Sequence, residues 1–186
     1  TSSEKEDIMN KYNILMKTKN DNIRYFKIRG PKPVSIQKEH LLIDNPGSIY
    51  SGYVVTEKAD GIRAQLMITN DKKGYLLTQK NEILDIGYDI SGIDGEWIFD
   101  GEYIQKDKNG SEIKLFMIFD VYCAADGAST SETYPGDAYS YPWISKDASD
   151  ISRSKILNDF QNSVIFKEIP DSSYIRIGYK NYFETP

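Results

Sequence analysis

Lys58, Asp60, Gly61 and Arg63 form one short segment whose residue types suit chemistry on an oxygen-rich group. A lysine amine is a potential nucleophile once it has lost its proton, and a guanidinium can bind two oxygens at once. Because lysine amines are ordinarily protonated at neutral pH, such a nucleophile needs nearby cations, a metal ion or basic residues, that favour the neutral amine. A surface hairpin that carries a Lys–Arg pair is the alternative interpretation.

Two further strings hold candidate site residues: Asp100-Gly101-Glu102, and an apolar run that ends in Phe119-Asp120. A carboxylate such as that of Glu102 accepts hydrogen bonds from hydroxyl groups, and the face of Phe119 can stack on a base. Each residue also has a structural alternative. Glu102 could pair with a lysine, Phe119 could belong to the core, and Asp100 or Asp120 could cap a turn.

These residues must be held by an α+β fold, which the pattern of the chain predicts to be mostly antiparallel β-sheet with a few helices. Helices are expected over residues 7–19 and 36–43, and from a cap at Ser149 through about residue 162. The Asp-Gly pairs at residues 60–61 and 100–101 predict turns between strands. The expected strands are residues 50–56, 62–69, 74–79, 82–84, 97–99, 102–105, 113–122, 164–169 and 174–183.

The composition suits a folded domain of 186 residues. Its net charge of −5 gives no general attraction to nucleic acid, so any RNA contact must depend on a local patch. The single cysteine, Cys123, excludes an internal disulfide and fits a reducing compartment such as the cytoplasm. No apolar run approaches the length of a membrane span. Because the chain begins without methionine, we expect it to be a piece of a longer polypeptide.

Three strings resemble, in order, motifs of the covalent nucleotidyltransferases, the family of mRNA capping enzymes and of DNA and RNA ligases. Residues 58–63 resemble motif I, residues 100–104 motif III and residues 116–122 motif IIIa. Another Asp-Gly-Glu, at residues 94–96, matches motif III less well because its flanks are less strand-like. Residues 175–183 are similar to the basic, aromatic strand that precedes motif IV.

Within this family the chain is most similar to the guanylyltransferase domain of capping enzymes, because ligases more often have Glu where Ile62 stands. Residues 30–41 also resemble the multifunctional capping enzymes of large cytoplasmic DNA viruses. An ATP-dependent RNA or DNA ligase is one alternative. A module without catalysis, which binds a nucleotide or a partner protein, is another.

The resemblance implies a reaction in two steps. Lys58 would attack the α-phosphate of GTP to form a covalent lysyl-GMP, and the GMP would then pass to the 5′-diphosphate end of an RNA. Arg63 and Glu102 would bind the ribose hydroxyls or the phosphate nearest the sugar, and Phe119 would stack on the purine. The implied partners are therefore GTP, an RNA 5′ end and the other domains of a longer capping polypeptide, with no membrane.

Four other residues are weaker candidates. Asp60 belongs to motif I, and Lys80 stands where the family often has a basic residue that binds phosphate. The resemblance implies Mg²⁺ or Mn²⁺, held largely by phosphates and water, and Asp100 and Asp120 could support this metal ion.

The expected organisation is an N-terminal helical and linker segment, residues 1–49, followed by an incomplete nucleotidyltransferase domain, residues 50–186. Motifs I, III and IIIa are present, whereas motifs IV and V and the OB-fold domain of capping enzymes are absent. In the family, the motif V lysines grip the α-phosphate. The chain as given is therefore expected to catalyse poorly or not at all.

Overall fold

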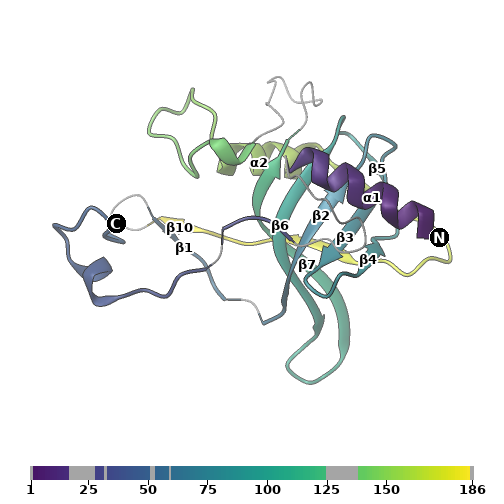
Figure 1. Ribbon diagram of the computed structural model, residues 1–186, viewed down its shortest axis with the longest axis horizontal. Helices are drawn as coiled ribbons and strands as arrows, with labels where there is room; N and C mark the ends of the chain where they lie inside the picture. The colour runs from purple at the N-terminus through teal and green to yellow at the C-terminus, as the bar shows by residue number, and fades with distance from the viewer. Residues whose placement is uncertain are drawn as a thin grey trace.

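The structure, a computed structural model, describes residues 2–16, 28–31, 33–50, 53–58, 60–124 and 138–184. Its centre is a six-stranded sheet with the order β4-β3-β2-β6-β7-β9 (Figure 1). All neighbouring strands in it are antiparallel except β7 and β9. This confirms the predicted α+β fold. The strands are β2 (Ile62–Ile68), β3 (Gly74–Thr78), β4 (Ile83–Asp85), β6 (Trp97–Lys106), β7 (Glu112–Cys123) and β9 (Arg176–Tyr179).

Two short ribbons complete the described strands. β1 (Val54–Val55) pairs with β10 (Phe183–Glu184), and β5 (Tyr88–Ser91) pairs with β8 (Ile165–Glu168). Sequence reasoning did not predict β5. The chain also forms two single turns of 3₁₀-helix, η1 (Lys38–Leu41) and η2 (Ala138–Ser140), so the helix expected over residues 36–43 is shorter than predicted.

Within the described residues, the two α-helices, α1 (Ser2–Leu15) and α2 (Arg153–Ser163), pack on opposite faces of the sheet (Figure 1). Side chains alternate between the faces of a strand, and β2 shows the result. Its Leu66 packs in the same cluster as Phe160 of α2, whereas Met67 packs in the same cluster as Tyr12 of α1. Neither α-helix, nor either 3₁₀ turn in the described part of the chain, has the length and apolar character of a membrane span.

Helix α1 is joined to the sheet by buried polar contacts as well as by packing. The Tyr12 hydroxyl donates to Gln65 Oε1 at 2.6 Å and accepts from the Arg29 backbone N–H at 2.9 Å. The Gln65 amide also donates to the Arg29 carbonyl, at 2.6 Å. The helix therefore belongs to the same folded unit as the sheet, while the expected boundary at residue 49 stays a prediction.

The prediction of a turn between two paired strands at Asp60-Gly61 was wrong. The strand before it, β1, pairs with β10 and not with β2, so the two runs do not form a hairpin. Glycine is required there for another reason. A Cβ on Gly61 would lie 2.5 Å from the Tyr103 carbonyl oxygen of β6, so only glycine allows this close approach.

The turn predicted at Asp100-Gly101 was also wrong, because both residues lie inside the continuous strand β6. A Cβ on Gly101 would collide with the Met117 carbonyl and the Phe116 ring of β7. The glycine therefore marks a close approach of two strands and not a turn.

The N-cap of α2 is Ser152 and not Ser149. The Ser152 side chain accepts a hydrogen bond from the backbone N–H of Lys155 at 3.3 Å. Ser149 instead lies in an exposed turn, where its N–H and hydroxyl both donate to Asp147 Oδ1. A cap must have its hydroxyl near the free N–H groups of the first helical turn, and Ser149 is too far from Arg153 along the chain.

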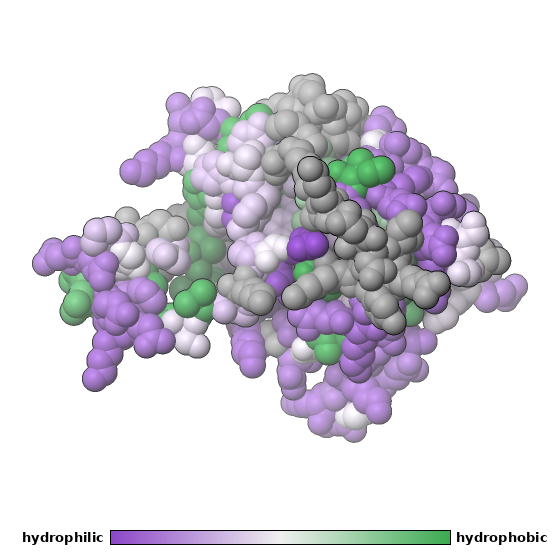
Figure 2. All heavy atoms as spheres, viewed as in Figure 1, coloured by the Kyte–Doolittle hydropathy of each residue, from purple (hydrophilic) through white to green (hydrophobic). Residues whose placement is uncertain are grey.

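The face that carries α1 is mostly hydrophilic, as Figure 2 shows. Residues 33–50 project from the body of the molecule (Figure 1) and carry several exposed hydrophobic side chains. His40 lies in η1 and accepts a hydrogen bond at Nδ1 from the Gln37 N–H, at 2.9 Å. It thus stabilises a local turn.

Candidate active site

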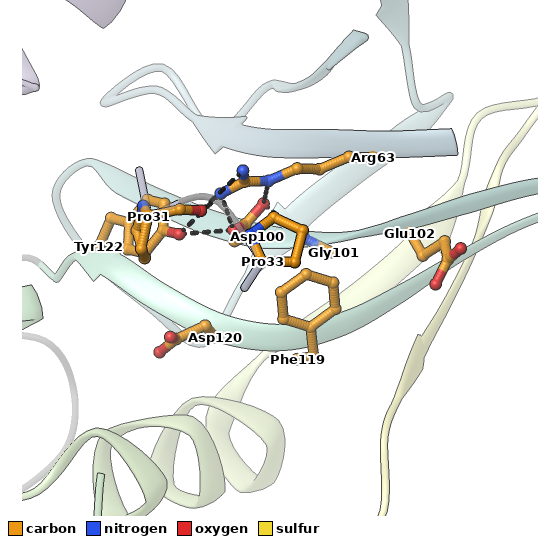
Figure 3. A pocket seen from close by; sticks show the side chains of 9 residues that line it. All are labelled: Pro31, Pro33, Arg63, Asp100, Gly101, Glu102, Phe119, Asp120 and Tyr122. Atoms are coloured by element: carbon orange, nitrogen blue, oxygen red, sulfur yellow. Dashed lines mark hydrogen bonds and ion pairs between the residues drawn. The ribbon is translucent and has the colours of Figure 1, made fainter. Parts of the chain in front are cut away.

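A cavity of about 350 Å³ opens on the side of the sheet that α1 covers (Figure 3). Five of the predicted site residues line it. The lining residues are Pro31, Pro33, Arg63, Asp100, Gly101, Glu102, Phe119, Asp120 and Tyr122. The three strings that resemble family motifs therefore meet in one place, although they are far apart in the sequence.

Strand pairing brings these residues together. Arg63 of β2 lies opposite Glu102 of β6, and Asp100 of β6 lies opposite Asp120 of β7. Because Gly101 pairs with Ile118, Phe119 is the extra residue of a β-bulge. A bulge redirects side chains, and this one lets both Phe119 and Asp120 line the cavity.

Arg63 and Asp100 form the most tightly bonded part of the site. The Arg63 guanidinium donates to both carboxylate oxygens, from Nε at 3.1 Å and from Nη2 at 2.6 Å. It also donates to the Tyr122 hydroxyl at 3.0 Å and to the Pro31 carbonyl at 2.9 Å. The side chain of Asp100 is 1% exposed, and this pairing raises the pKa of Arg63 above its ordinary value.

Asp100 therefore orients Arg63 and does not offer oxygens to a metal ion. Its Oδ1 accepts from Arg63 Nε and the Gly101 N–H, and its Oδ2 accepts from Arg63 Nη2 and the Tyr122 hydroxyl, the last at 2.5 Å. A carboxylate has about four acceptor positions, and these four donors fill them. Burial is the main reason why the pKa of Tyr122 is raised, and its neutral hydroxyl serves as donor to Asp100.

Glu102 contacts both the segment that resembles motif I and a lysine near the end of β9. Its Oε1 accepts the backbone N–H of Gly61 at 2.9 Å, and its Oε2 lies 3.6 Å from Lys180 Nζ. Lys180 Nζ also lies over the ring of Phe119, 5.1 Å from its centroid. Sequence reasoning noted the basic, aromatic strand over residues 175–183 but assigned Lys180 no role.

Asp120 is paired with Arg153, a residue that sequence reasoning missed. Arg153 Nε donates to Asp120 Oδ1 at 2.8 Å, and both side chains are 16% exposed. The Val121 N–H donates to the same oxygen. Burial raises the pKa of Asp120, although Arg153 acts in the opposite direction. Both hydrogen bonds that the described residues make to Asp120 end on Oδ1, so Oδ2 is the carboxylate oxygen best placed for another ligand.

Three carboxylates line the cavity and each is paired with its own cation. The pairs are Asp100 with Arg63, Glu102 with Lys180 and Asp120 with Arg153. The wall is therefore close to neutral even though the chain carries a net charge of −5. An anionic ligand can enter such a cavity without facing uncompensated carboxylates.

Lys58, Asp60 and Lys80 are exposed and are not among the residues that line the cavity. Lys58 lies between β1 and Gly61, three residues before the N–H that binds Glu102. Three residues of chain span at most about 11 Å, which keeps Lys58 close to this end of the cavity. Lys80 lies in the turn between β3 and β4, at the same end of the sheet, because Thr78 pairs with Ala64.

The aromatic residues of the loop before α2 are only partly described. Tyr134 lies outside the described residues, whereas Tyr139, Tyr141 and Trp143 lie inside them. The Arg153 guanidinium lies 4.7 Å from the ring centroid of Tyr139 and 5.7 Å from that of Trp143.

The described part of the chain contains no group of three or more His, Cys, Asp or Glu side chains that could hold a metal ion.

Comparison with known proteins gives a match to one protein family. A search of curated proteins found no match. The family model described as mRNA capping enzyme, catalytic domain, matches residues 1–136, which include α1 and all three strings whose residues meet at the cavity. Because this match covers well over half of the chain, the chain belongs to the family of mRNA capping enzyme catalytic domains.

Proposed function

We propose that the chain is the nucleotide-binding part of an mRNA guanylyltransferase, and that Lys58 forms a covalent bond with GMP derived from GTP. The observation that carries the proposal is the meeting of Arg63, Glu102 and Phe119 in one cavity. Membership of the capping enzyme family supports a nucleotidyltransferase of this class.

The proposed first step is a substitution at phosphorus. The neutral amine of Lys58 forms a bond to the α-phosphorus of GTP. The bond from that phosphorus to the bridging oxygen breaks, and pyrophosphate leaves with the electron pair. The proton that the amine loses passes to water. In the second step, an oxygen of an RNA 5′-diphosphate end replaces the lysine nitrogen, so that GMP passes to the RNA and the amine is regenerated.

The side chains of the cavity supply recognition in this scheme. Phe119 stacks on the purine, and the carboxylate of Glu102 accepts hydrogen bonds from ribose hydroxyls. Arg63 is held in one orientation by Asp100 and Tyr122, so its guanidinium is positioned for the sugar or the adjoining phosphate before the ligand arrives. Asp60 and Lys80 are proposed as further nucleotide contacts from the same end of the sheet.

Mg²⁺ or Mn²⁺ would be held mainly by the phosphates and by water, as is usual for Mg²⁺ at nucleotide sites. Of the two predicted carboxylate ligands, Asp100 does not fit, because its acceptor positions are filled. Asp120 fits better through Oδ2. When bound, the metal ion would neutralise charge on the phosphates.

The buried thiol of Cys123 is compatible with a reducing compartment, and we propose the cytoplasm.

The test is intact-mass analysis of the chain after incubation with a divalent metal and either GTP or ATP. The expected result is an adduct of one GMP that appears with GTP, at low yield because the motif V lysines are missing, and that is lost in Lys58→Ala. The matched control, Lys106→Ala, removes an exposed lysine at the end of β6 and should leave the adduct unchanged. An AMP adduct would move the assignment to a ligase. Binding of GTP without any adduct would contradict the covalent step, and no binding would contradict the assignment of the cavity.

A further inference from the structure

Arg153, the first residue of α2, contacts the cavity wall from outside the three motif strings. Its Nε donates to Asp120 Oδ1 at 2.8 Å. Its Nη1 donates to the Tyr141 carbonyl, and the guanidinium lies 4.7 Å from the ring centroid of Tyr139. Both side chains of the Arg153–Asp120 pair are only 16% exposed, so the pair is largely shielded from bulk water. In such a shielded place the attraction between two charges is stronger than in water, and an unpaired charge costs more free energy.

A second set of contacts leads from Arg153 through Tyr139 to Tyr122. The ring beneath its guanidinium, Tyr139, packs edge-on against Tyr122, with ring centroids 4.9 Å apart and an angle of 90°. The Tyr122 hydroxyl donates to Asp100 Oδ2 and accepts from Arg63 Nη2. Arg153 thus contacts Asp120 directly and supports Tyr122 through Tyr139.

We propose that Arg153 is a positioning residue for nucleotide binding: it neutralises and orients Asp120 so that the cavity accepts an anionic nucleotide, and it holds Tyr139 against Tyr122. This inference rests on the proposed nucleotide function of the cavity. Arg153 itself does not line the cavity, so it acts through Asp120 and Tyr139 and not by touching the ligand.

The charge balance around Asp120 gives the proposal a testable signature. The groups that face Asp120 are Arg153 of α2, Asp100 of β6, Tyr122 of β7 and Tyr182 next to β10. Among them Arg153 is the cation, and its Nε donates to Asp120 Oδ1 at 2.8 Å. Without Arg153 the carboxylate of Asp120 would lose this counter-charge in a largely buried wall.

The expected effect of Arg153→Gln follows from this balance. At neutral pH the variant has an unpaired carboxylate in the cavity wall, which repels the triphosphate, and GTP affinity should fall on the order of tenfold. Arg153→Lys should recover part of the affinity, because an ammonium restores the charge without the geometry of the guanidinium.

The experiment is isothermal titration of the whole chain with GTP at neutral pH and without divalent metal ions, for the parent, Arg153→Gln, Arg153→Lys, Asp120→Asn and the double variant Asp120→Asn/Arg153→Gln. The double variant has neither charge and should bind more tightly than Arg153→Gln alone. Arg176→Gln, which removes an exposed arginine of β9, should bind like the parent. Circular dichroism of each variant confirms that it is folded.

The outcomes separate the two proposals. If the parent chain does not bind GTP, the proposed function fails. If it binds and Arg153→Gln binds equally well, the positioning role fails. A loss that neither Arg153→Lys nor the additional change Asp120→Asn relieves would also overturn it, because the effect of Arg153 would then be on general structure and not on the charge of Asp120.

Discussion

At the scale of single residues, the cavity wall is organised by compensated charge. Asp100, Glu102 and Asp120 would make the wall strongly anionic on their own, yet each is paired with an arginine or a lysine. The three pairs differ in burial and distance, and Arg63–Asp100 is the shortest, with Asp100 almost fully buried. Removal of one partner should therefore lower the free energy of unfolding most at this pair, because a buried unpaired charge is more destabilising than an exposed one.

The variant Asp100→Asn tests this ranking and also the choice between the two Asp-Gly-Glu strings. We expect it to lower the free energy of unfolding by about 3 kcal/mol, because it leaves the Arg63 guanidinium without its counter-charge. It should also weaken GTP binding through the loss of a fixed Arg63.

Asp94→Asn is the matched control from the other string. The side chain of Asp94 is 67% exposed and pairs with Lys72 at 2.8 Å, an interaction expected to contribute less than about 1 kcal/mol. Urea unfolding of both variants measures the difference. Equal losses of stability would contradict the assignment of Asp100 as the buried partner of Arg63.

At the scale of secondary-structure elements, the N-terminus of α2 contacts the cavity wall, since Arg153 immediately follows the cap and pairs with Asp120. Ser152→Ala should lower the free energy of unfolding by about 1 kcal/mol, because an N–H of the first turn loses its acceptor. Ser149→Ala, at the position that sequence reasoning chose as the cap, should have little effect, because Ser149 is exposed and bonded to Asp147. Thermal unfolding of both variants decides between them, and a larger loss for Ser149→Ala would place the cap there.

The elements also show how far sequence reasoning could go. The strands β2, β3 and β4 were predicted well, because polar turns and alternating side chains are local signals. The partner of β1 could not be predicted, because β10 lies far away in the sequence. The pairing of two strands so distant leaves no pattern in the residues of either strand. Both Asp-Gly pairs were misjudged as turns, because the sequence does not show that a neighbouring strand passes close to each glycine.

The site was predicted to a similar degree. Arg63, Asp100, Glu102, Phe119 and Asp120 lie together at the cavity, and their resemblance to family motifs was the signal. Arg153 and Lys180 were missed as partners of the cavity carboxylates, because only the folded chain brings them to β6 and β7. The nucleotide and metal roles of all the predicted site residues, including Lys58, Asp60 and Lys80, stay predictions.

At the scale of the whole molecule, α1 is joined to the sheet through the buried hydroxyl of Tyr12. The chain segment it holds, at Arg29, leads directly to Pro31, whose carbonyl accepts from Arg63. The N-terminal helix and the cavity are therefore linked by a short run of backbone, which agrees with a family match that begins at residue 1.

Tyr12 gives the molecule a specific sensitivity to alkali. Burial raises the pKa of Tyr12 from its ordinary value of 10.0 to about 12. Between these two values the unfolded chain releases the phenol proton and the folded chain keeps it, so the free energy of unfolding should fall as pH rises through this range. Tyr12→Phe should be less stable at neutral pH by about 1–3 kcal/mol, because Gln65 and the Arg29 N–H lose a partner.

The measurement is chemical unfolding of both chains across this pH range. The variant cannot ionise at position 12, so its stability should fall less steeply with pH and the two curves should converge. Parallel curves would show that the Tyr12 hydroxyl does not titrate in the folded protein as its burial implies. Tyr75→Phe is a suitable control, because Tyr75 lies beside the same helix but is only half-buried.

The pairing of β1 with β10 has a consequence for the order in which parts of the chain can fold. Lys58 lies three residues after Val55, and in the described part of the chain Val54 and Val55 pair with Glu184 and Phe183. During synthesis on a ribosome, the hairpins of β2, β3 and β4 can form early, whereas the segment before Lys58 waits until nearly all of the described chain has emerged. The candidate nucleophile would therefore reach its final position among the last parts of the chain, after the rest of the cavity has formed.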